Sequence, residues 1–447
     1  MSDGIQYAGE FSVDTLTISS AKSPDKIINL TGVGITQFDI YESIFSTSVL
    51  GKISIIDDNN LLSNLPILGQ ERINIEFSTV GLDGVSIKKE FIVYEVIARE
   101  ELTKGAEIFT LNLVSLEFLQ NTRTEISKSF TDTISNIVRN ILTTDPIDYP
   151  NSKVFIDETS GIRKVNFPSC YPYKAIERLA TESVDKNSGS PFTLFFESLE
   201  GIHFQSLLSL YKNPIAQEFN SGDATVLLGE GQTKSNDIED EMQRIIGVSV
   251  PSQNNMIVNT KIGMLSSKMI EYNIFTKSYE TTTFNYFDDF GKYERISGNS
   301  VEDNPVYIDT NIPHTQKRVS DFPAAAKYLH TVSSYKEKDA EHYSKSKQML
   351  YEPNKISSTL LHRNSRYSEL QGNTVVTIQT HGISTLRAGR PVIFNKKVVG
   401  RDHNDEEFSS LYRGKFLISK ARHTFDIPNK RYSTILTLVK DSSPTAH

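Results

Sequence analysis

At 447 residues, the chain is long enough for about two to four domains of roughly 100–200 residues, each able to bury a core of its own. Its 38% hydrophobic and 23% charged residues are typical of a globular protein. The formal net charge of -8 argues against the strongly basic surface that neutralises nucleic-acid phosphates, and the single cysteine, Cys170, excludes an internal disulfide framework.

Residues 1–118 predict a β-domain. Five segments alternate apolar with polar residues: FDIYESIF (38–45), LGKISIID (50–57), RINIEFSTV (72–80), EFIVYEVIARE (90–100) and IFTLNLVSL (108–116). A period of two places one face of each strand in a core and the other in solvent. Turn residues such as GLDG (81–84) separate the segments, and this hairpin spacing favours a small antiparallel barrel or sandwich.

Residues 119–236 predict an α+β domain. Apolar residues of SFTDTISNIVRNILTTDP (129–146) recur with the helical period: Ile134, Ile137, Val138, Ile141 and Leu142. The expected N-cap of this helix is Thr131 or Asp132. A second amphipathic helix is expected near 171–184 with Pro172 at its start, and FTLFFESLEGIHFQSL (192–207) should form a hairpin that turns at Glu200 and Gly201. Alternatively, this region is a spacer that only packs against the first domain.

Residues 216–236 are rich in Gly, Ser and Asn, which is typical of a boundary. The β-like segments beyond it are RIIGVSV (244–250), MIVNTKIGML (256–265), YNIFTKSYETTTFNYF (272–287), NTVVTIQTHG (373–382) and RPVIFNK (390–396). A helical stretch is expected over 321–350. We therefore expect a second, discontinuous barrel from 237–290 and 370–447, interrupted by an insertion with helices at 291–369, because loops tolerate added length at modest entropic cost.

Two hairpins of the sequence share one plan: FIVYEVIAREELTKGAEIFTLNLV (91–114) and FLISKARHTFDIPNKRYSTILTLV (416–439). Leu111 follows Phe91 by 20 residues, and Leu436 follows Phe416 by the same 20 residues. Upstream, LGQERINIEF (68–77) corresponds loosely to AGRPVIFN (388–395). The alternative is that any two hairpins with strands of about ten residues look alike. A duplicated β-domain would mean that a ring of such chains presents twice as many equivalent barrels as it has subunits.

Motifs for catalysis or cofactor binding are missing from the sequence, which has no GxxxxGK[ST], HExxH, CxxC or GxSxG pattern. The most metal-like cluster, GRDHNDEEF (400–408), is expected to be a solvated hairpin tip, and the nine His residues have no ligand spacing. Cys170 is expected to be a small buried side chain. We therefore expect no enzyme activity, no catalytic residue, no cofactor and no metal.

Three other sequence features were considered: paired acidic residues, a secretory signal and a membrane-spanning segment. The acidic pairs Asp57-Asp58, Glu100-Glu101 and Asp288-Asp289 fall in or beside turns, where paired acids usually face solvent. The N-terminus lacks the basic and apolar regions of a secretory signal. No run of ~18 apolar residues occurs, so no membrane-spanning segment is expected.

Three stretches carry a resemblance to a known family: YESIFSTSVLGKISIIDDNNLLSNLPILGQERINIEFST (41–79), FFESLEGIHFQSLLSLY (195–211), and YRGKFLISKARHTF with YSTILTLVKDS (412–425 and 432–442). In them the chain resembles the baseplate hub proteins of contractile-tailed bacteriophages, which are also similar to the N-terminal part of type VI secretion spike proteins. The resemblance implies a mainly β fold with α+β insertions and two tube-protein-like antiparallel β-barrels per chain.

The resemblance also implies a role and partners. The chain would be a structural hub subunit of the virion tail baseplate, assembled in the host cytoplasm as a homotrimer. It would join the six-fold tail tube protein to the three-fold cell-puncturing spike protein, contact other baseplate proteins and surround DNA only in transit. Two barrels in each of three chains match a hexameric ring, and the acidic balance suits a conduit that does not trap DNA phosphates. The alternatives are a component of a phage-derived injection or secretion machine and, less favoured, a polysaccharide-degrading enzyme of the tail.

Overall fold

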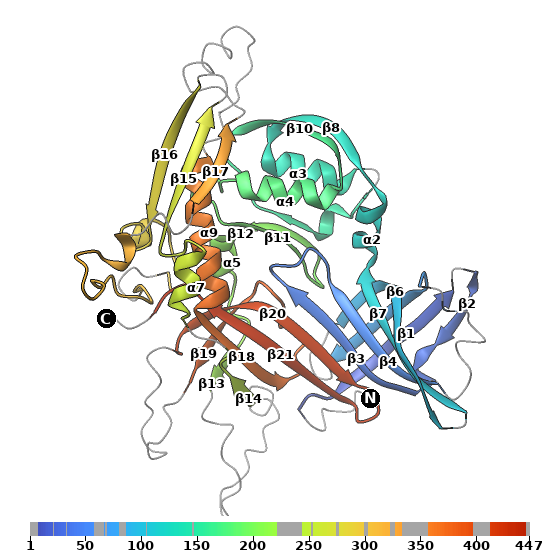
Figure 1. The fold of residues 1–447 in the computed structure, drawn as a ribbon. Coiled ribbons are helices and arrows are strands. Elements are labelled where there is room, and N and C mark those ends of the chain that lie inside the picture. Colours follow the sequence, from blue (N-terminus) through green and yellow to red (C-terminus); the bar gives the residue numbers. More distant parts are fainter. Residues whose placement is uncertain are drawn as a thin grey trace, which may run out of the picture.

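A computed structural model describes most of the chain (Figure 1). The described residues are 8–20, 22–32, 34–57, 67, 69–79, 86–103, 105–144, 147–220, 244–251, 254–273, 277–298, 303–321, 327–332, 356–396 and 412–443. The largest sheet in this part of the chain contains 13 strands. Among the described helices, none combines the length and the apolar character needed to span a membrane.

The first group of strands comes from the N-terminal region. Its members are β1 (Phe11–Ser20), β2 (Ser23–Asn29), β3 (Gly34–Ser43), β4 (Leu50–Asp57), β5 (Arg72–Thr79), β6 (Ser86–Thr103) and β7 (Ala106–Ser115), with the 3-10 turn η1 (Leu30–Gly32) after β2. They lie in the order β3-β4-β7-β6-β5-β1-β2, and every neighbouring pair is antiparallel. The five strands that alternation predicts are confirmed as β3 to β7; β1 and β2 precede them and were not predicted.

An α+β unit follows the first group. Its elements are α2 (Leu116–Arg123), β8 (Ile126–Thr133), α3 (Ile134–Thr143), η2 (Asn151–Lys153), β9 (Val154–Ile156), β10 (Ile162–Cys170), α4 (Pro172–Glu182), β11 (Thr193–Glu197), β12 (Ile202–Ser206) and α5 (Leu207–Lys212). The predicted apolar stripe of α3 is buried, Pro172 starts α4, and β11 and β12 pair around Gly201 as expected. The N-cap prediction was wrong. Thr133 caps α3, because β8 still pairs Thr131 and Asp132 with β10.

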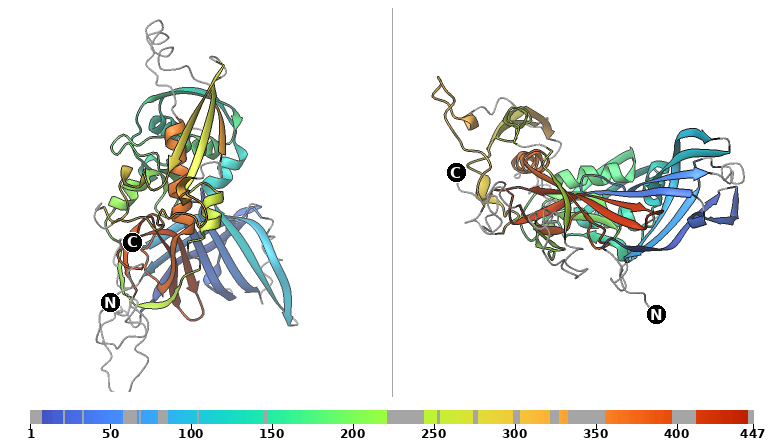
Figure 2. Two further views of the ribbon diagram at one scale, coloured as in Figure 1. Left: turned by 60° about the vertical axis from the view of Figure 1, so that its left-hand side comes forward. Right: turned by 90° about the horizontal axis from the view of Figure 1, so that it is seen from below.

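The second group of strands comes from the C-terminal half. It contains β13 (Glu218–Asn220), β14 (Ile245–Ser249), β18 (Thr374–His381), β19 (Pro391–Asn395), β20 (Lys415–Asp426) and β21 (Arg431–Lys440). The order is β14-β18-β21-β20, with β19 antiparallel to β20 and β13 parallel to β19. Because β20 also pairs with β3, the two groups form one continuous curved sheet (Figure 2). The predicted mainly β fold is therefore confirmed, and the strand groups expected as two barrels are joined edge to edge in one large curved sheet.

The remaining elements differ from the grouping expected for 237–290 and 291–369. Strands β15 (Ser266–Asn273), β16 (Ser278–Asn285) and β17 (Lys327–Val332) form a separate sheet, accompanied by α7 (Met256–Lys261), α9 (Ile356–Gly372), η4 (Phe290–Lys292) and η5 (Val319–Asp321). Of residues 237–290, only β14 lies in the large sheet, so that β15 and β16 are not part of a second barrel.

Two local predictions in this region were also wrong. Residues 256–265 were expected to form a strand, but Asn255 accepts a hydrogen bond from the backbone N–H of Val258 at 3.1 Å and starts helix α7. Within the helix expected over 321–350, residues 327–332 form β17, because parallel pairing with β15 overrides local helix propensity. Residues 333–350 lie outside the described part of the chain.

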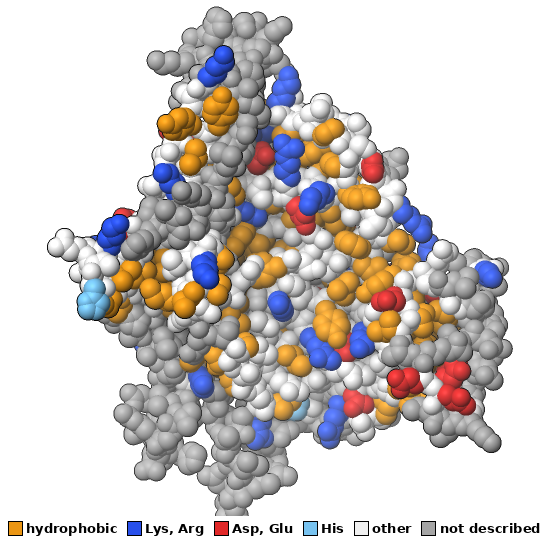
Figure 3. Space-filling view, viewed as in Figure 1, with side chains coloured by type: hydrophobic (Ala, Val, Ile, Leu, Met, Phe, Trp, Pro, Cys, Tyr) orange, Lys and Arg blue, Asp and Glu red, His pale blue; other side chains and the backbone are white. Residues whose placement is uncertain are grey.

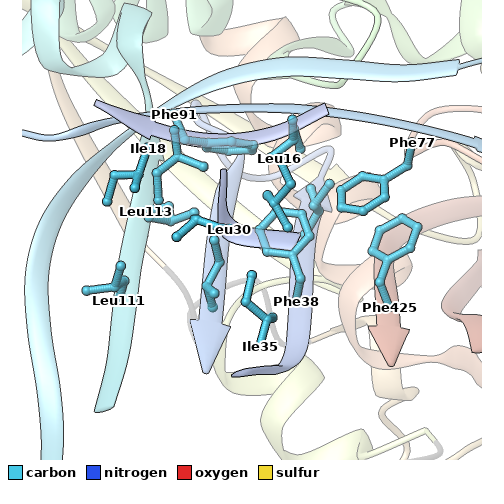
Figure 4. Close-up of a cluster of buried hydrophobic side chains, with 14 of the residues drawn as sticks. Leu16, Ile18, Leu30, Ile35, Phe38, Phe77, Phe91, Leu111, Leu113 and Phe425 are labelled. Atoms are coloured by element: carbon cyan, nitrogen blue, oxygen red, sulfur yellow. The ribbon is translucent and has the colours of Figure 1, made fainter. Parts of the chain in front are cut away.

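The core beneath the large sheet is shared by both strand groups. Phe425 of the second group lies beside Phe77 at one end of a cluster that also contains Leu16, Ile18, Phe38, Phe91, Leu111 and Leu113 of the first group (Figure 4). Helices α3 and α4 bury a second core against β9 to β12. A third core, around Phe192 and Phe196, holds the α+β unit against α9 and the ends of β20 and β21. The strands of the large sheet thus pack on hydrophobic cores that they share with the α+β unit and α9.

Candidate assembly interface

The two predicted hairpins have the same pairing register up to Ile97 of β6 and Arg422 of β20, beyond which β6 has two further register shifts that β20 lacks. In β6–β7 the pairs are Ile92–Val114, Val93–Leu113 and, after a bulge at Tyr94, Glu95–Asn112 and Val96–Leu111. In β20–β21 they are Leu417–Val439, Ile418–Leu438 and, after a bulge at Ser419, Lys420–Thr437 and Ala421–Leu436. A β-bulge adds one residue to one strand and increases the local twist, so its recurrence at one position is a specific structural feature. The predicted equivalence of Leu111 with Leu436 therefore holds in the pairing of the strands.

The equivalence extends to two further strands on the β7 and β21 side. Strand β4 pairs with β7 through Leu50–Val114 and Ile53–Leu111, and β18 pairs with β21 through Val375–Val439 and Ile378–Leu436. The next strands are β3, with the pairs Ile35–Ile55 and Gln37–Ser54, and β14, with the pairs Ile245–Thr380 and Gly247–Gln379. The pairing of β3 with β4 skips Thr36, and the pairing of β14 with β18 skips Ile246. The four-stranded unit β3-β4-β7-β6 therefore recurs as β14-β18-β21-β20, including both bulges.

The segments before β5 and β19 repeat a third detail. Gly69 and Gly389 both have a φ of 87°, a conformation that glycine adopts without strain. The carbonyl of Glu71, two residues after Gly69, accepts from the N–H of Val93 at 2.9 Å, and the carbonyl of Arg390, one residue after Gly389, accepts from the N–H of Ile418 at 2.9 Å. Segments 68–77 and 388–395, which correspond loosely in sequence, therefore also correspond in structure.

A junction between β20 and β3 joins the two units within the chain. Residues 420–426 of β20 pair antiparallel with residues 43–37 of β3. On the buried face, the ring of Phe425 stacks on Phe77 and on Tyr432, with 4.4 Å between ring centroids in each case, and Phe38 stacks on Phe77 at 5.5 Å. Such aromatic pairs contribute about 0.5–1.5 kcal/mol beyond the burial of their area. This side of the junction is a dry aromatic core (Figure 4).

The opposite face of the junction is polar. We call it the open face, and its residues include Asp39, Tyr41, Lys52, Asn112, Lys420, Arg422 and Thr424. Asp39 accepts from Thr424 Oγ1 at 2.7 Å and from Arg422 Nη2 at 3.1 Å. Burial and the neighbouring Asp39 raise the pKa of Tyr41. A hollow of about 230 Å³ lies here beside Tyr41 and Arg422, smaller than the ~300–1,000 Å³ of most small-molecule sites.

Glu42 fixes the end of the junction. Its buried carboxylate accepts from the backbone N–H of Leu199 and of Ala388, each at 3.0 Å, and lies 3.9 Å from Arg387. Burial raises the pKa of Glu42 above its ordinary value, although Arg387 and the two N–H donors oppose the increase. Glu42 thereby ties β3 to the β11–β12 turn and to the loop before β19.

A second buried carboxylate, Glu197, attaches the α+β unit to the first strand group. It accepts from the N–H of Val49 at 3.0 Å, from Ser115 Oγ at 2.6 Å and from Lys89 Nζ at 2.6 Å. Lys89 also lies 3.2 Å from Glu117. Every charge in this cluster therefore has a partner, which a buried ion pair needs to offset its desolvation.

A third buried cluster connects α9 with the end of β21. Arg295 Nη1 lies 2.6 Å from Glu369 Oε2, and Arg366 pairs with Asp441. Asp441 also accepts from Tyr211 OH at 2.9 Å and from the N–H of Ile296 at 3.1 Å. These contacts hold the insertion helix α9 against the large sheet.

The residues considered from the sequence as candidates for catalysis or metal binding do not lie together in one site. The acidic cluster 400–408 lies outside the described residues. Glu100 and Glu101 are exposed on β6, and Asp289 lies in a turn 3.5 Å from His362 Nε2. Cys170 is half-buried at the end of β10, and burial raises the pKa of its thiol. Within the described ranges, no group of three His, Cys, Asp or Glu side chains could hold a metal ion.

One pair with a catalytic appearance escaped the sequence search. Ser198 Oγ lies 2.8 Å from His203 Nε2, and His203 Nδ1 lies 2.9 Å from Gln205 Oε1. Both Ser198 and His203 are buried, and the imidazole is stacked between the rings of Phe155 and Phe196. Ser198 Oγ also accepts from the N–H of Glu200 at 3.1 Å. The pair thus holds the hairpin turn in place. Its members are too near in sequence to carry a recognisable spacing signal.

Sequence reasoning missed most of the interface residues for a physical reason. Asp39 and Arg422 meet only because β3 and β20 pair across almost the whole chain, and Glu42 reaches Ala388 and Leu199 only through the tertiary fold. The repeat of β3 and β4 as β14 and β18 was hidden too, because the elements of the insertion lie between the latter two. A search near residue 375 for the alternating pattern of β4 could have revealed that β18 repeats β4.

Comparisons with known proteins agree with this architecture. No protein-family model matches the chain, and no curated protein sequence matches it. Among solved structures, the chain is similar to the 43 kDa tail protein of prophage MuSo2 from Shewanella oneidensis, with a TM-score of 0.50 and 10% identity over 96% of this chain and 98% of that one. A tail protein from Neisseria meningitidis aligns with a TM-score of 0.49 and 10% identity over 97% of both chains.

A third solved structure is a component of the type VI secretion system of E. coli, described as similar to the T4 bacteriophage tail proteins gp27 and gp5. It aligns with a TM-score of 0.45 and 11% identity, covering 97% of this chain and 78% of that one. At these identities the likeness concerns the fold. The MuSo2 match confirms the fold that the sequence resemblance implied: this chain has the overall fold of a phage tail protein.

Proposed function

We propose that the chain is a structural baseplate hub subunit, a homotrimeric symmetry adaptor between a six-fold tail tube and a three-fold spike. The observation that carries this proposal is the repeat of a four-stranded unit in one register, joined into one sheet by β20 and β3. Three copies closed by rotation would present six such units. A hexameric tube ring would then meet six nearly equivalent surfaces.

The differences between the two units support a second, three-fold surface. The first unit is extended by β5, β1 and β2 through antiparallel pairs, whereas the second is extended by β19 and the parallel strand β13. Glu197 attaches the α+β unit beside the first unit. A trimer would repeat these features three times, which suits contact with a spike protein and with other baseplate proteins.

We assign the open face to the lumen of the proposed ring. Figure 3, viewed as Figure 1, shows acidic, basic and hydrophobic side chains intermixed over the large sheet. Arg422 is neutralised by Asp39, and Glu95 accepts a hydrogen bond from Asn112 Nδ2 at 2.9 Å. A lumen of mixed charge would let DNA pass without holding its phosphates, since retention requires concentrated positive charge. In this role the chain needs no catalytic group, cofactor or metal.

Copy number in purified particles tests the proposal. Quantitative mass spectrometry of assembled tails should give three copies of this chain for every six copies of the tube protein in one ring. Six copies in equivalent environments would mean an ordinary tube ring and would refute the adaptor.

Two other roles remain to be separated from a virion hub. A hub of an injection or secretion machine would occur in particles without a DNA-filled head, which electron microscopy of the producing cells would reveal. A polysaccharide-degrading enzyme would release reducing sugars from surface glycans of the host, and the purified chain is expected to release none.

A further inference from the structure

The short turn η4, which follows β16, carries one acidic and one basic side chain on the same side. The backbone N–H of Lys292 donates to the carbonyl of Asp289 at 3.1 Å, and side chains three residues apart in such a 3-10 turn nearly eclipse each other. Both side chains reach His362 of α9, whose Nε2 lies 3.4 Å from Lys292 Nζ and 3.5 Å from Asp289 Oδ1. One imidazole nitrogen therefore has two neighbours of opposite charge.

The imidazole of His362 is held in place but is not sealed from solvent. Its ring packs edge-to-face with the rings of Phe284 and Tyr293, at centroid distances of 4.9 and 5.6 Å. The side chain of His362 is 10% exposed, that of Asp289 is 30% exposed, and Lys292 lies at the surface. The two aromatic rings fix the orientation of the imidazole, so that it can exchange a proton with solvent without leaving its place.

The remaining charged or titratable groups around His362 leave the balance of charge to η4. Among the described residues, those that line a cavity of about 20 Å³ together with His362 and Asp289 are Tyr286, Tyr293, Arg295, Arg366 and Glu369. Both arginines are already paired, Arg295 with Glu369 and Arg366 with Asp441. Burial raises the pKa of both tyrosines, which keeps them neutral where histidine titrates. The charge that a protonated His362 meets is thus set mainly by Asp289 and Lys292.

The chemistry of imidazole allows His362 to use only one of these two partners at a time. A neutral ring has one nitrogen that accepts, and the ammonium group of Lys292 can only donate. When both ring nitrogens carry a proton, Nε2 can only donate, and the carboxylate of Asp289 is the acceptor beside it. We propose that His362 is a pH-sensitive clasp between α9 and η4: the neutral ring binds Lys292, and the protonated ring releases Lys292 to solvent and forms an ion pair with Asp289.

The clasp would respond between about pH 5 and pH 8, where histidine is the side chain that ordinarily titrates. Protonation adds an ion pair between α9 and η4, and a partly buried pair is screened by salt less than a surface pair. The same proton repels Lys292, because like charges at this distance disfavour each other. At low pH η4 is therefore held more tightly to α9, and the head of Lys292 moves into solvent. The clasp lies within one chain and does not depend on the proposed ring.

NMR titration of the full-length chain, isotopically labelled at the histidine Cε1 carbon, tests the clasp. The His362 resonance is identified by its absence from His362→Gln, or by its contact with the ring of Phe284 if that variant does not fold. Asp289→Asn should lower its titration midpoint by about 1 pH unit, and Lys292→Gln should raise it, because an opposite charge favours the protonated ring and a like charge disfavours it. The matched control Asp288→Asn removes the neighbouring exposed carboxylate and should shift the midpoint far less, since solvent and salt screen that charge.

Hydrogen exchange of the peptide that contains η4 separates the exchange of partners from titration alone. After correction for the intrinsic effect of pH, the wild type should be better protected at about pH 5.5 than at about pH 7.5, and Asp289→Asn should lose this difference. A midpoint that stays the same in Asp289→Asn and Lys292→Gln would overturn the clasp. Equal shifts in Asp289→Asn and Asp288→Asn would overturn it as well, because a general field would then act on the ring. Protection that is independent of pH in the wild type would show that η4 is not clasped, even if the midpoint moves.

Discussion

Buried ionisable side chains connect distant parts of this chain, and Asp441 is one of them. Burial would raise its pKa, but Arg366, Arg295, the N–H of Ile296 and Tyr211 together hold the pKa below its ordinary value. A carboxylate with a depressed pKa stabilises the folded state above its unfolded pKa of ~3.9, and that stabilisation is lost as the pH falls through the lower folded value.

Replacing Asp441 with Asn should therefore destabilise the protein by about 3–5 kcal/mol at neutral pH, because the two arginines lose a buried partner. Urea unfolding at pH 7 measures the loss. The difference from wild type should shrink as the pH falls below ~4. Glu158→Gln removes an ion pair with Lys186 that is exposed on both sides, and should leave the midpoint unchanged. A mild effect of Asp441→Asn would mean that Glu369 alone satisfies both arginines.

His423 should make stability depend on pH in the range where histidine titrates. It is fully buried with its Nδ1 2.7 Å from Tyr432 OH, and burial, followed by the charge of Arg387, holds its pKa well below the ordinary value. Below pH ~6.5 the unfolded chain binds a proton at this residue that the folded chain does not. Stability should therefore fall with decreasing pH, by up to about 1.4 kcal/mol per pH unit.

The comparison variant is His423→Gln, which keeps a polar group near Tyr432 but does not titrate. Thermal unfolding between pH 7.5 and 5 should show a smaller dependence on pH than in the wild type. His203 also has a pKa lowered by burial, but it is present in both proteins, so the difference isolates His423. Parallel curves for the two proteins would exclude this role.

Residue-level features of this kind were beyond the reach of the sequence. The alternation of β4 shows that Ile53 and Ile55 point inward, as they do. It does not show that Glu42, in an alternating strand, points into the molecule toward Ala388 and Leu199. The partners of a buried charge depend on tertiary contacts, and the pattern along a strand contains no information about them.

At the scale of elements, the repeat supplies a matched pair of glycines. Gly69 and Gly389 share a φ of 87°, so an alanine at either position pays roughly 1–2 kcal/mol for the left-handed conformation. The atom nearest to a Cβ at Gly69 would be Tyr94 O at 3.5 Å, an ordinary van der Waals distance, whereas at Gly389 the Cβ would lie 3.0 Å from Phe196 Cζ. Gly389→Ala should add an overpacking cost of about 1–3 kcal/mol. Equal losses of stability for the two variants, measured by urea unfolding, would contradict this account.

The aromatic junction gives a second prediction at this scale. Phe425→Ala should destabilise the chain by about 3–5 kcal/mol, because it removes a ring that stacks on Phe77 and Tyr432 and leaves a cavity between the strand groups. Glu101→Ala, at the equivalent exposed position of the other unit, should change stability by less than ~0.5 kcal/mol. Chemical denaturation measures both. Similar effects at the two positions would mean that the ring of Phe425 contributes no more to stability than an exposed side chain does.

Element types were predictable where local pattern and tertiary pairing agree. The alternating strands β3 to β7 and the stripe of α3 are of this kind. Residues 327–332 follow three alanines and favour a helix locally, yet they form β17 because β15 offers a parallel partner. The repeat was visible in the hairpin 416–439, where the strands are contiguous, and hidden in β14 and β18, which are brought together by the fold.

At the scale of the molecule, the sequence indicated two β-units but not how they connect. Pairing between β3 and β20 depends on residues near both ends of the chain, and it turns the two units into one sheet in which β14 is an edge strand. An edge strand exposes backbone groups that can pair with another chain. The capacity to assemble is thus a property of the whole sheet.

Val248→Lys should separate assembly from folding. Val248 is 37% exposed at the open edge of β14, so a lysine there can reach solvent in the single chain, and its stability should change by no more than ~0.5 kcal/mol. If the edge of β14 meets a neighbouring copy in the proposed ring, the charge of the same lysine would have to be desolvated. Analytical ultracentrifugation should show a folded monomer for this variant, and tails should fail to incorporate it.

The control Tyr279→Lys, at a side chain that is 76% exposed on the separate sheet, should assemble as the wild type does. Normal incorporation of the Val248 variant would mean that β14 lies outside the interface, and unfolding of the isolated variant would mean that this edge is already covered within one chain.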